Sequence, residues 1–398
     1  MYSQIISAKT LYALMTQQEH RTYCRGKNKE YMIDAIQNIC VNKIYDDSYH
    51  FNLARQGNLC INAHPYGAIE HLCQDLLIRK LSKNIMHTYG LKTTNRNLVI
   101  LQIKQLLESN IPLCIMRKDV RNFFENVSTT MILSELKKEG RITLQTIQLC
   151  EALLTETDSK GVKGVPRGLA ISSAMTEFLM RKFDHTFTKI PDILLYNRYV
   201  DDIILINTNQ CSISEIQDLV DDSLGVIKLQ ENTDKKISLT NQDWIDGKKF
   251  EYLGYSFQYS NKSPTVCIAN KKLNRIKTKI TKAFKDFIKT GDEKLLFDRM
   301  QFLACISYIK NSSLRKIKVG LPANYSFVTT DESFKKIDIY YQRILHSKRG
   351  NFGKNLQKRL TETYKDKLSR ISFVHCYKGQ IKRRFSATRM HQLKNCWR

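Results

Sequence analysis

Residues 194–206 read LLYNRYVDDIILI, an apolar stretch interrupted by a short polar segment. Asp201 and Asp202 lie side by side at its centre. The apolar residues on both sides predict two strands over 193–206, joined by a turn at the two carboxylates. Aspartate is common in tight turns, so the pair alone predicts no more than a turn. Two like charges between buried strands also suit a site that binds cations.

A third carboxylate, Asp119, follows a short apolar run at 113–116, which we expect to form another strand of the same sheet. Neighbouring strands would bring Asp119 close to Asp201 and Asp202. Carboxylates this close repel one another and are hard to keep ionised together without cations. Two Mg²⁺ ions, or Mn²⁺ in their place, take such oxygen ligands together with substrate phosphates and support in-line phosphoryl transfer. The three aspartates therefore predict a two-metal catalytic site.

The periodicity of apolar residues predicts the elements around these strands. Residues 1 to about 100 are expected to be mostly helical with one hairpin. The further predicted helices lie at 68–81, 97–107, 128–140, 170–187 and 212–226. The remaining predicted elements are a loop at 161–168, a strand near 237–239 and an aromatic hairpin at 250–258. Their order indicates an α+β fold in which helices cover a sheet.

The net charge of +26 is concentrated in the last third of the chain. Residues 271–398 hold 32 Lys+Arg and 9 Asp+Glu, whereas residues 1–270 hold 32 and 29. We expect this third to be helical, with loops at 320–324 and 350–353. One-sided positive charge favours a polyanionic partner, and nucleic acid is the commonest. The alternative is a solvated basic surface. Membrane binding is not expected, because the charges do not form one amphipathic helix.

Eleven cysteines are scattered singly along the chain without a C-x-x-C pair. This distribution is typical of reduced thiols in a cytosolic protein. No signal peptide or membrane-spanning stretch is evident in the sequence. We therefore expect a cytoplasmic location.

Five segments stand in a fixed order along the chain. They are RKDVRNFF at 117–124, GVPRG with ISS at 164–173, YVDD at 199–202, DKKI at 234–237 and YLGY at 252–255. In this order they resemble the motifs of bacterial reverse transcriptases of the retron and group II intron superfamily, over roughly residues 87–259. The resemblance implies a right-hand polymerase fold: an N-terminal segment and fingers at 1–112, a palm with interspersed fingers elements at 113–260, and a basic helical thumb with a C-terminal extension at 261–398.

The resemblance also implies roles for single residues. Asp119 and Asp201 would bind both metals, with Asp202 as a weaker ligand, and the backbone at Val120 would contact the nucleotide triphosphate. Phe124 matches the steric gate, whose ring crowds a 2′-hydroxyl and selects deoxynucleotides. The alternative for the Phe124 ring is ordinary core packing, the role we expect for its neighbour at 123.

Other residues are expected near the nucleotide. Lys235, with Lys236 as the alternative register, matches the lysine that neutralises or protonates the leaving pyrophosphate. Lys92 and Arg96 align loosely with the segment that clamps the phosphates, or are solvated charges before a helix. Arg167 and Gly168 match the loop that holds the nucleotide.

Arg167 stands where the family usually has glutamine. An arginine offers only donors and a fixed charge, so the usual neutral contact is lost. The resemblance associates such departures, the 319–325 segment VGLPANY and the short length with the defence-associated, abortive-infection branch.

The last third matches a thumb that holds nucleic acid. YLGY would be the primer grip through Tyr252, Leu253, Gly254 and Tyr255, or plain strand residues. Beyond it, phosphates would be contacted by Lys271, Lys272, Arg275, Lys279, Lys382, Arg383 and Arg384, with aromatic residues such as Phe373 and Phe385 available for stacking.

Together these features predict an RNA-directed DNA polymerase that makes cDNA from a structured non-coding RNA in bacterial antiviral defence. Its expected partners are the RNA template, the DNA product and dNTPs, with a partner protein, a second reverse transcriptase of a defence operon or a homo-oligomer left open, and no membrane. The alternatives are a non-templated or protein-primed DNA polymerase of the abortive-infection type and an inactive RNA-binding scaffold.

Overall fold

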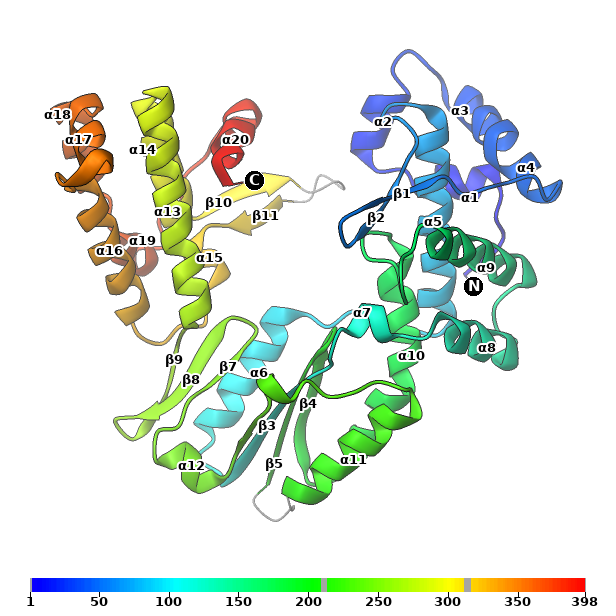
Figure 1. Cartoon of the computed structure of the whole chain (residues 1–398), viewed down its shortest axis with the longest axis horizontal. Helices are drawn as coiled ribbons and strands as arrows, with labels where there is room; N and C mark the ends of the chain where they lie inside the picture. Colours follow the sequence, from blue (N-terminus) through cyan, green and yellow to red (C-terminus); the bar gives the residue numbers. More distant parts are fainter. Residues whose placement is uncertain (1, 209–212, 311–315, 398) are drawn as a thin grey trace. The chain divides into compact units, whose positions relative to one another are not determined.

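The strands predicted around Asp201 form an edge strand and the adjacent inner strand of a four-stranded antiparallel sheet in the computed structural model, which describes residues 2–208, 213–310 and 316–397. The strand order is β4-β5-β3-β6, and Figure 1 labels the first three of these strands. Their bounds are β3 Leu113–Asp119, β4 Ile193–Tyr199, β5 Asp202–Thr208 and β6 Ile237–Leu239. Every strand predicted here is confirmed at or near the predicted bounds. The apolar runs of β3 and β5 are buried, whereas the edge strand β4 is only partly buried.

Helices cover one face of this sheet. Ile203 and Leu205 of β5 share a core with apolar residues of α10 (Ile171–Phe187) and α11 (Ile213–Val226). Both helices were predicted; Ser212, where the prediction began the second, lies outside the described residues. The other helices that follow β3 are α7 Phe123–Asn126, α8 Thr129–Glu139 and α9 Leu144–Ser159.

The predicted cap of α8 is confirmed. The Ser128 side chain accepts a hydrogen bond from the Met131 N–H, and Gly140 ends the helix with a φ of 60°. The helix α9 was not predicted.

The N-terminal residues are mostly helical and contain one hairpin, as predicted. Strands β1 Leu53–Gln56 and β2 Leu59–Asn62 pair as an antiparallel hairpin. The helices are α1 Ala8–Tyr12, α2 Gln17–Tyr23, α3 Lys29–Ile36, the π-helical turn η1 Gln37–Val41, α4 Asn42–Tyr45, α5 Ile69–Thr88 and α6 Arg96–Glu108.

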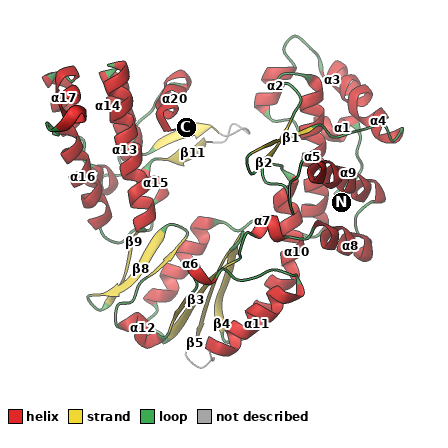
Figure 2. Cartoon of the chain, viewed as in Figure 1, coloured by secondary structure: helices red, strands yellow, loops and turns green. Residues whose placement is uncertain are grey.

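The chain divides into two compact units, which we call the N-terminal unit (Met1–Val99 and Ile111–Asn241) and the C-terminal unit (Ile100–Asn110 and Gln242–Arg398). The N-terminal unit contains the four-stranded sheet and the short 3₁₀ turn η2 Thr233–Lys235. Besides Ile100–Asn110, which includes most of α6, the C-terminal unit contains nearly all of α12 Asn241–Ile245 and a three-stranded sheet, β7 Phe250–Tyr252, β8 Tyr255–Ser260 and β9 Ser263–Ile268 (Figure 2).

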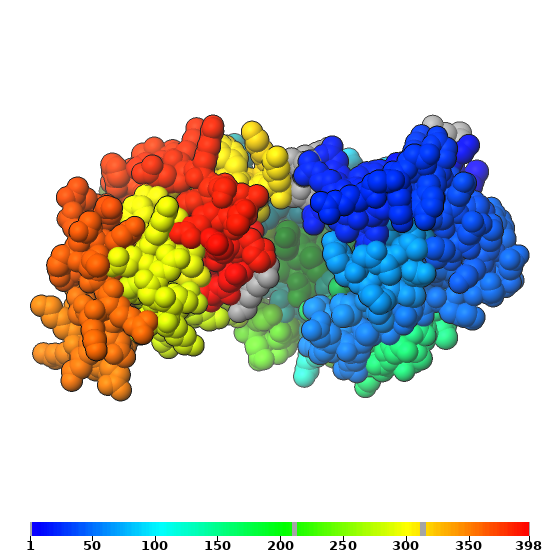
Figure 3. All heavy atoms as spheres, turned by 90° about the horizontal axis from the view of Figure 1, so that it is seen from above, coloured from blue at the N-terminus to red at the C-terminus, as the bar shows by residue number. Residues whose placement is uncertain are grey.

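Helices and one hairpin make up the rest of the C-terminal unit. The hairpin consists of β10 Ser307–Lys310 and β11 Lys316–Val319. The helices are α13 Asn270–Thr290, α14 Glu293–Ala304, α15 Leu321–Asn324, α16 Glu332–Leu345, α17 Gly350–Arg359, α18 Glu362–Ser369, α19 Phe373–Lys378, α20 Ala387–Lys394 and the 3₁₀ turn η3 Asn395–Trp397. Seen from above, the red C-terminal atoms lie beside the yellow atoms of α13 and α14 (Figure 3).

Three predictions for this unit are wrong. The last third is not wholly helical, because it contains the β10–β11 hairpin. The expected loops at 320–324 and 350–353 lie in or at the start of helices α15 and α17. Glycine and proline suggested loops there, but glycine caps α15 and proline occupies its first turn, where a missing N–H costs nothing.

No helix among the described residues is long and apolar enough to cross a membrane. The described cysteines are all free thiols.

Candidate active site

The turn between β4 and β5, which carries Asp201, has a strained backbone at Val200. Val200 has a φ of 63°, a left-handed conformation that is rare for a β-branched residue and costs about 1–3 kcal/mol. The pair Tyr199 and Asp202 closes the turn. The Arg198 guanidinium donates a hydrogen bond to the Val200 carbonyl at 3.0 Å, which holds the turn from below.

The three predicted aspartates lie at the same end of adjacent strands. Asp119 and Asp202 are direct partners across the β3–β5 ladder. The Val120 N–H donates to the carbonyl of Asp201 at 2.9 Å, so the backbones of the two carboxylate segments are joined. In this structure the Val120 N–H is therefore used within the protein. The expected contact of the Val120 backbone with a triphosphate stays a prediction.

Cationic and amide donors contact two of the three carboxylates. Arg117 donates from Nε and Nη2 to the two oxygens of Asp202, at 2.8 and 2.9 Å. The Lys235 ammonium lies 2.8 Å from Asp119 Oδ2, and the Asn232 side-chain amide donates to the same oxygen at 3.0 Å. Lys235 is therefore the lysine of the DKKI segment that reaches the carboxylates.

The site disfavours ionised carboxylates. Burial raises the pKa of Asp201, and the negative charge of Asp119 raises it further. Burial also raises the pKa of Asp202, and the hydrogen bond and charge of Arg117 only partly oppose this. A bound cation would therefore stabilise the ionised forms of these carboxylates.

The donor set fits a divalent metal ion on two of the three aspartates. Among the described residues, no group of three Asp, Glu, His or Cys side chains is arranged to hold a metal. Asp202 accepts from Arg117 on both oxygens, whereas Lys235 and Asn232 contact Asp119 only through Oδ2. Asp119 and Asp201 are hard oxygen donors whose repulsion a metal would relieve. We therefore assign Asp119 and Asp201 as the residues that could hold the metal.

The two phenylalanines after Asp119 differ in environment. Phe123 is buried, with 1% of its surface exposed, whereas Phe124 is only partly buried against the core. The Arg167 guanidinium stacks on the Phe124 ring, 4.9 Å from its centroid. Arg167 also pairs with Glu125 through Nε at 2.8 Å and Nη2 at 3.0 Å. Arg167 is thus fixed beside Phe124, the predicted steric gate.

Two glycines allow the GVPRG loop to pack closely at this point. Gly164 has a φ of 68°, and a Cβ there would lie 2.3 Å from the Phe124 carbonyl oxygen. The Val165 N–H donates to that same oxygen at 2.8 Å. Gly168 has a φ of 99°, and its Cβ would lie 2.7 Å from the Cys60 carbonyl oxygen. The loop that carries Arg167 is therefore packed between Phe124 and strand β2.

Arg198 is a positioning residue that the sequence analysis missed. Its side chain is 3% exposed and pairs with Glu177 at 2.6 Å and Asp184 at 2.7 Å, both on α10. It thereby connects α10 to the Val200 carbonyl. A fixed cation inside an apolar strand was the signal that could have revealed it.

Lys118 was missed in the same way. Its side chain is fully buried on the opposite face of β3 from Asp119 and pairs with Asp221 at 3.2 Å and Glu231 at 2.9 Å. Glu231 bridges to the backbone of Val120. The ion pair therefore holds the 231–235 segment, and with it Lys235, against β3.

Lys92 and Arg96 flank a loop that is tied to the site. Thr94, between them, donates to the Arg198 carbonyl at 2.6 Å. Lys92 is exposed and Arg96 begins α6. Their contact with phosphates stays a prediction.

The predicted primer grip lies in the C-terminal unit. Tyr252 and Tyr255 are fully buried, and the Tyr255 hydroxyl donates to the Asn324 carbonyl at 3.1 Å. Leu253 and Gly254, with φ of 46° and 87°, form the turn between β7 and β8 and remain partly exposed. Any contact of this hairpin with nucleic acid therefore falls to the turn and not to the tyrosine rings.

The predicted nucleic-acid-binding residues of the C-terminal unit lie on helix α13 and in the segment before α20. The apolar face of α13 is buried as predicted, through Leu273, Ile276, Ile280, Phe284 and Phe287. The opposite face carries Lys271, Lys272, Arg275 and Lys279, which are exposed or partly exposed. Lys382, Arg383 and Arg384 form an exposed segment before α20, and Phe385 beside them is partly buried. Phe373, expected for stacking, is instead buried in the core.

Comparison with known proteins agrees with this arrangement. Residues 58–257, half of the chain, match the model of the family described as reverse transcriptase (RNA-dependent DNA polymerase). The match begins before the 87–259 range taken from the motifs. No curated protein sequence matches the chain significantly.

Solved structures of telomerase are similar to parts of the chain. That of Candida tropicalis in complex with a fragment of telomeric RNA is 14% identical, with a TM-score of 0.42, over 91% of this chain and 67% of that one. That of Candida albicans in a similar complex is 12% identical, with a TM-score of 0.39, over 80% and 54%. The truncated apo form from Candida tropicalis is 13% identical, with a TM-score of 0.38, over 60% of each chain. The chain thus spans less than two thirds of the latter two structures.

Proposed function

The chain belongs to the reverse transcriptase (RNA-dependent DNA polymerase) family, and on that premise we propose that it synthesises DNA on an RNA template. Its fold is the mixed helix and antiparallel-sheet fold of right-hand polymerases. The observation that carries the proposal is the junction of Asp119 and Asp201 at one end of adjacent strands, with Lys235 on Asp119.

The proposed roles follow from the geometry. Asp119 and Asp201 would hold the divalent metal ions, Mg²⁺ or Mn²⁺, while Arg117 keeps Asp202 in place as a supporting charge. When bound, two such ions activate the attacking hydroxyl and stabilise the leaving oxygen. Lys235, which pairs with Asp119, would neutralise developing negative charge on a leaving pyrophosphate. Phe124 would exclude a 2′-hydroxyl.

The second candidate is DNA synthesis that no nucleic-acid template directs, with protein priming as one form. The observation that favours it is the Arg167–Glu125 pair, because an arginine fixed by a carboxylate cannot make the neutral contact usual at this position. Sequencing the products separates the two candidates. Complementarity to a co-purified RNA supports templated synthesis, and its absence supports the second candidate.

We further propose that the enzyme acts in bacterial antiviral defence, in the cytoplasm, on a cognate structured non-coding RNA. The support is the motif resemblance to the defence-associated branch and the basic last third of the chain. In this proposal, residues 1–112 act as fingers, 113–260 as palm and 261–398 as thumb and extension.

Purification of the protein from its host, followed by sequencing of bound RNA and DNA, tests the biological proposal. One enriched structured RNA with complementary DNA supports it. A random sample of cellular RNA, with no effect of the gene on phage infection, would contradict it.

A further inference from the structure

One face of the β10–β11 hairpin is basic and aromatic. Tyr308 pairs directly with Lys318, and Lys310 pairs with Lys316. Because directly paired residues, and residues two apart, share a face of a sheet, these four side chains lie on the same face. The three lysines are exposed, and Tyr308 is partly exposed. The hairpin thus presents one ring among three positive charges.

An extended segment before α20 lies along this hairpin. The Ile306 N–H donates to the Ile381 carbonyl and the Arg383 N–H to the Ile306 carbonyl, both at 2.8 Å. This parallel bridge centres on Lys382. The backbone contacts therefore fix the position of Lys382 and Arg384 relative to Tyr308.

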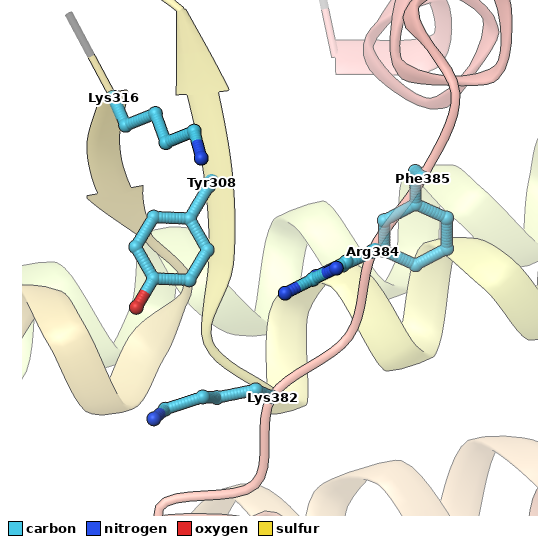
Figure 4. Close-up of a pocket in the computed structure, with 5 residues that line it drawn as sticks. All are labelled: Tyr308, Lys316, Lys382, Arg384 and Phe385. Atoms are coloured by element: carbon cyan, nitrogen blue, oxygen red, sulfur yellow. The ribbon is translucent and has the colours of Figure 1, made fainter.

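The two segments line one pocket, which we call the Tyr308 pocket. Its volume is about 720 Å³, and it is lined by Tyr308, Lys316, Lys382, Arg384 and Phe385. In Figure 4 the Arg384 guanidinium points toward the Tyr308 ring, the Lys382 side chain extends below the ring, and the Lys316 side chain lies above it. Three cations from two segments thus lie around one aromatic ring.

The Tyr308 pocket has no nearby source of negative charge in its own segments. Residues 299–330 and 367–398 contain no Asp or Glu. Among the described residues, no carboxylate forms an ion pair with Lys316, Lys382 or Arg384. Holding these cations close together raises their electrostatic energy, which a polyanion would lower.

We propose that the Tyr308 pocket binds single-stranded nucleic acid. One unpaired base stacks on the Tyr308 ring, and adjacent phosphates contact Lys316, Lys382 and Arg384. Aromatic stacking and phosphate contacts together are the usual means of holding single strands without sequence preference, whereas a paired base is not free to stack on a protein ring. The volume suits one or two nucleotides.

The choice of ligand rests on the proposed function, since a reverse transcriptase handles both template RNA and product DNA as single strands. The pocket itself lies wholly within the C-terminal unit and uses none of the catalytic aspartates. Binding can therefore be measured without polymerisation.

Fluorescence anisotropy of the full chain in EDTA tests the proposal. The probes are fluorescein-labelled oligouridylate and oligothymidylate of about 12 nucleotides, with a duplex of the same length as competitor. Tyr308→Ala should weaken binding of the single strand roughly 5- to 150-fold, and Tyr308→Phe should leave it unchanged. Lys382→Ala with Arg384→Ala should lower the slope of log affinity against log salt by about 1.4.

The control variant is Lys354→Ala with Lys358→Ala, which removes two exposed cations of α17 in the same unit. If this control loses as much affinity as the pocket variants, or if the duplex competes as well as the single strand, the proposal is overturned. Tighter uridylate binding that Tyr308→Ala abolishes assigns the pocket to RNA, and tighter thymidylate binding abolished in the same way assigns it to DNA.

Asp201→Asn separates this proposal from the proposed function. The variant should bind the oligonucleotides like the wild type even though it polymerises nothing. Should Tyr308→Ala fail to fold, the surface pair Lys382→Ala with Arg384→Ala still decides the outcome. Unchanged affinity and salt slope in that pair would overturn the proposal.

Discussion

At the scale of single residues, Arg167 is held by Glu125 beside Phe124. We expect Arg167→Gln, which introduces the residue that the motif resemblance leads us to expect at this position, to increase the share of product that is complementary to the template. The reason is that the glutamine amide can both donate and accept, whereas the arginine is held by Glu125. The measurement is the sequence of DNA made on a defined RNA. Unchanged complementarity in Arg167→Gln, with Lys163→Gln as a control in the same loop, would count against this role.

The same pair predicts a pH dependence of stability. Burial raises the pKa of Glu125, but the hydrogen bond and charge of Arg167 lower it more, so the net shift is downward. Such a carboxyl stabilises the fold above its unfolded pKa, near 4.5, and loses this contribution as pH falls through its folded pKa. Both side chains are about 40% exposed, so solvent screening limits the effect to about 0.5 kcal/mol.

Urea denaturation of Glu125→Gln checks this expectation. The variant should be less stable than the wild type at pH 7 by that small amount, and the difference should shrink as the pH falls below about 4.5. A difference that stays constant or grows as the pH falls would show that the ion pair is not its source.

Phe124 and Phe123 should respond oppositely to truncation. Phe124→Val should lower the preference for dNTPs over rNTPs by at least roughly tenfold while changing stability little, because the ring is only partly buried. Phe123→Ala should instead destabilise the fold by about 3–5 kcal/mol, because it opens a cavity in the core. Competition between dCTP and rCTP incorporation measures the first effect. Equal nucleotide preference in Phe124→Val and the wild type would show that Phe124 is not the steric gate.

The sequence predicted the carboxylates but not what surrounds them. Asp119, Asp201 and Lys235 were found because motif and strand position coincide. Arg117, Arg198 and Lys118 were not, because the sequence does not show which distant carboxylate a cation will meet in the folded chain. Their placement on buried strands was the only local sign that each must be paired.

At the scale of elements, Arg198 joins strand β4, helix α10 and the turn of Asp201. Removing it would leave Glu177 and Asp184 without their buried cation. We expect Arg198→Met to destabilise the protein by about 3 kcal/mol and to lower polymerase activity, since the Val200 carbonyl also loses its donor. The control is Lys182→Ala, which removes the α10 member of an exposed ion pair between two helices. It should lower the stability by less than about 1 kcal/mol.

Urea midpoints and dNTP incorporation measured on both variants test this. If Arg198→Met matches the control in stability and in activity, the network does not hold the turn.

Most elements could be predicted where apolar periodicity is strong, as in β3, β5, α10 and α13. The β10–β11 hairpin could not, because each strand has only four residues and lysines alternate with apolar residues only in β11. Such a short basic alternation fits a solvated helix or loop equally well until its partner strand is known.

At the scale of the whole molecule, acidic and basic side chains are distributed unevenly along the chain. The N-terminal unit holds the carboxylates of the candidate active site, and the basic excess lies in residues 271–398 of the C-terminal unit. Charge distribution alone predicted a polyanionic partner but not which surface would bind it. The Tyr308 pocket arises from two segments more than 60 residues apart in sequence, a juxtaposition that only the folded chain reveals.

The most direct test of the account is primer extension on a defined RNA template with dNTPs and Mg²⁺, comparing the wild type with Asp201→Asn. Asp222→Asn, an exposed aspartate on α11, is the matched control. We predict template-complementary DNA from the wild type and the control, and a loss of at least roughly a hundredfold in Asp201→Asn, because the carboxylate is expected to hold the metal. Extension by Asp201→Asn at the wild-type rate would contradict the assignment of this site as the polymerase centre.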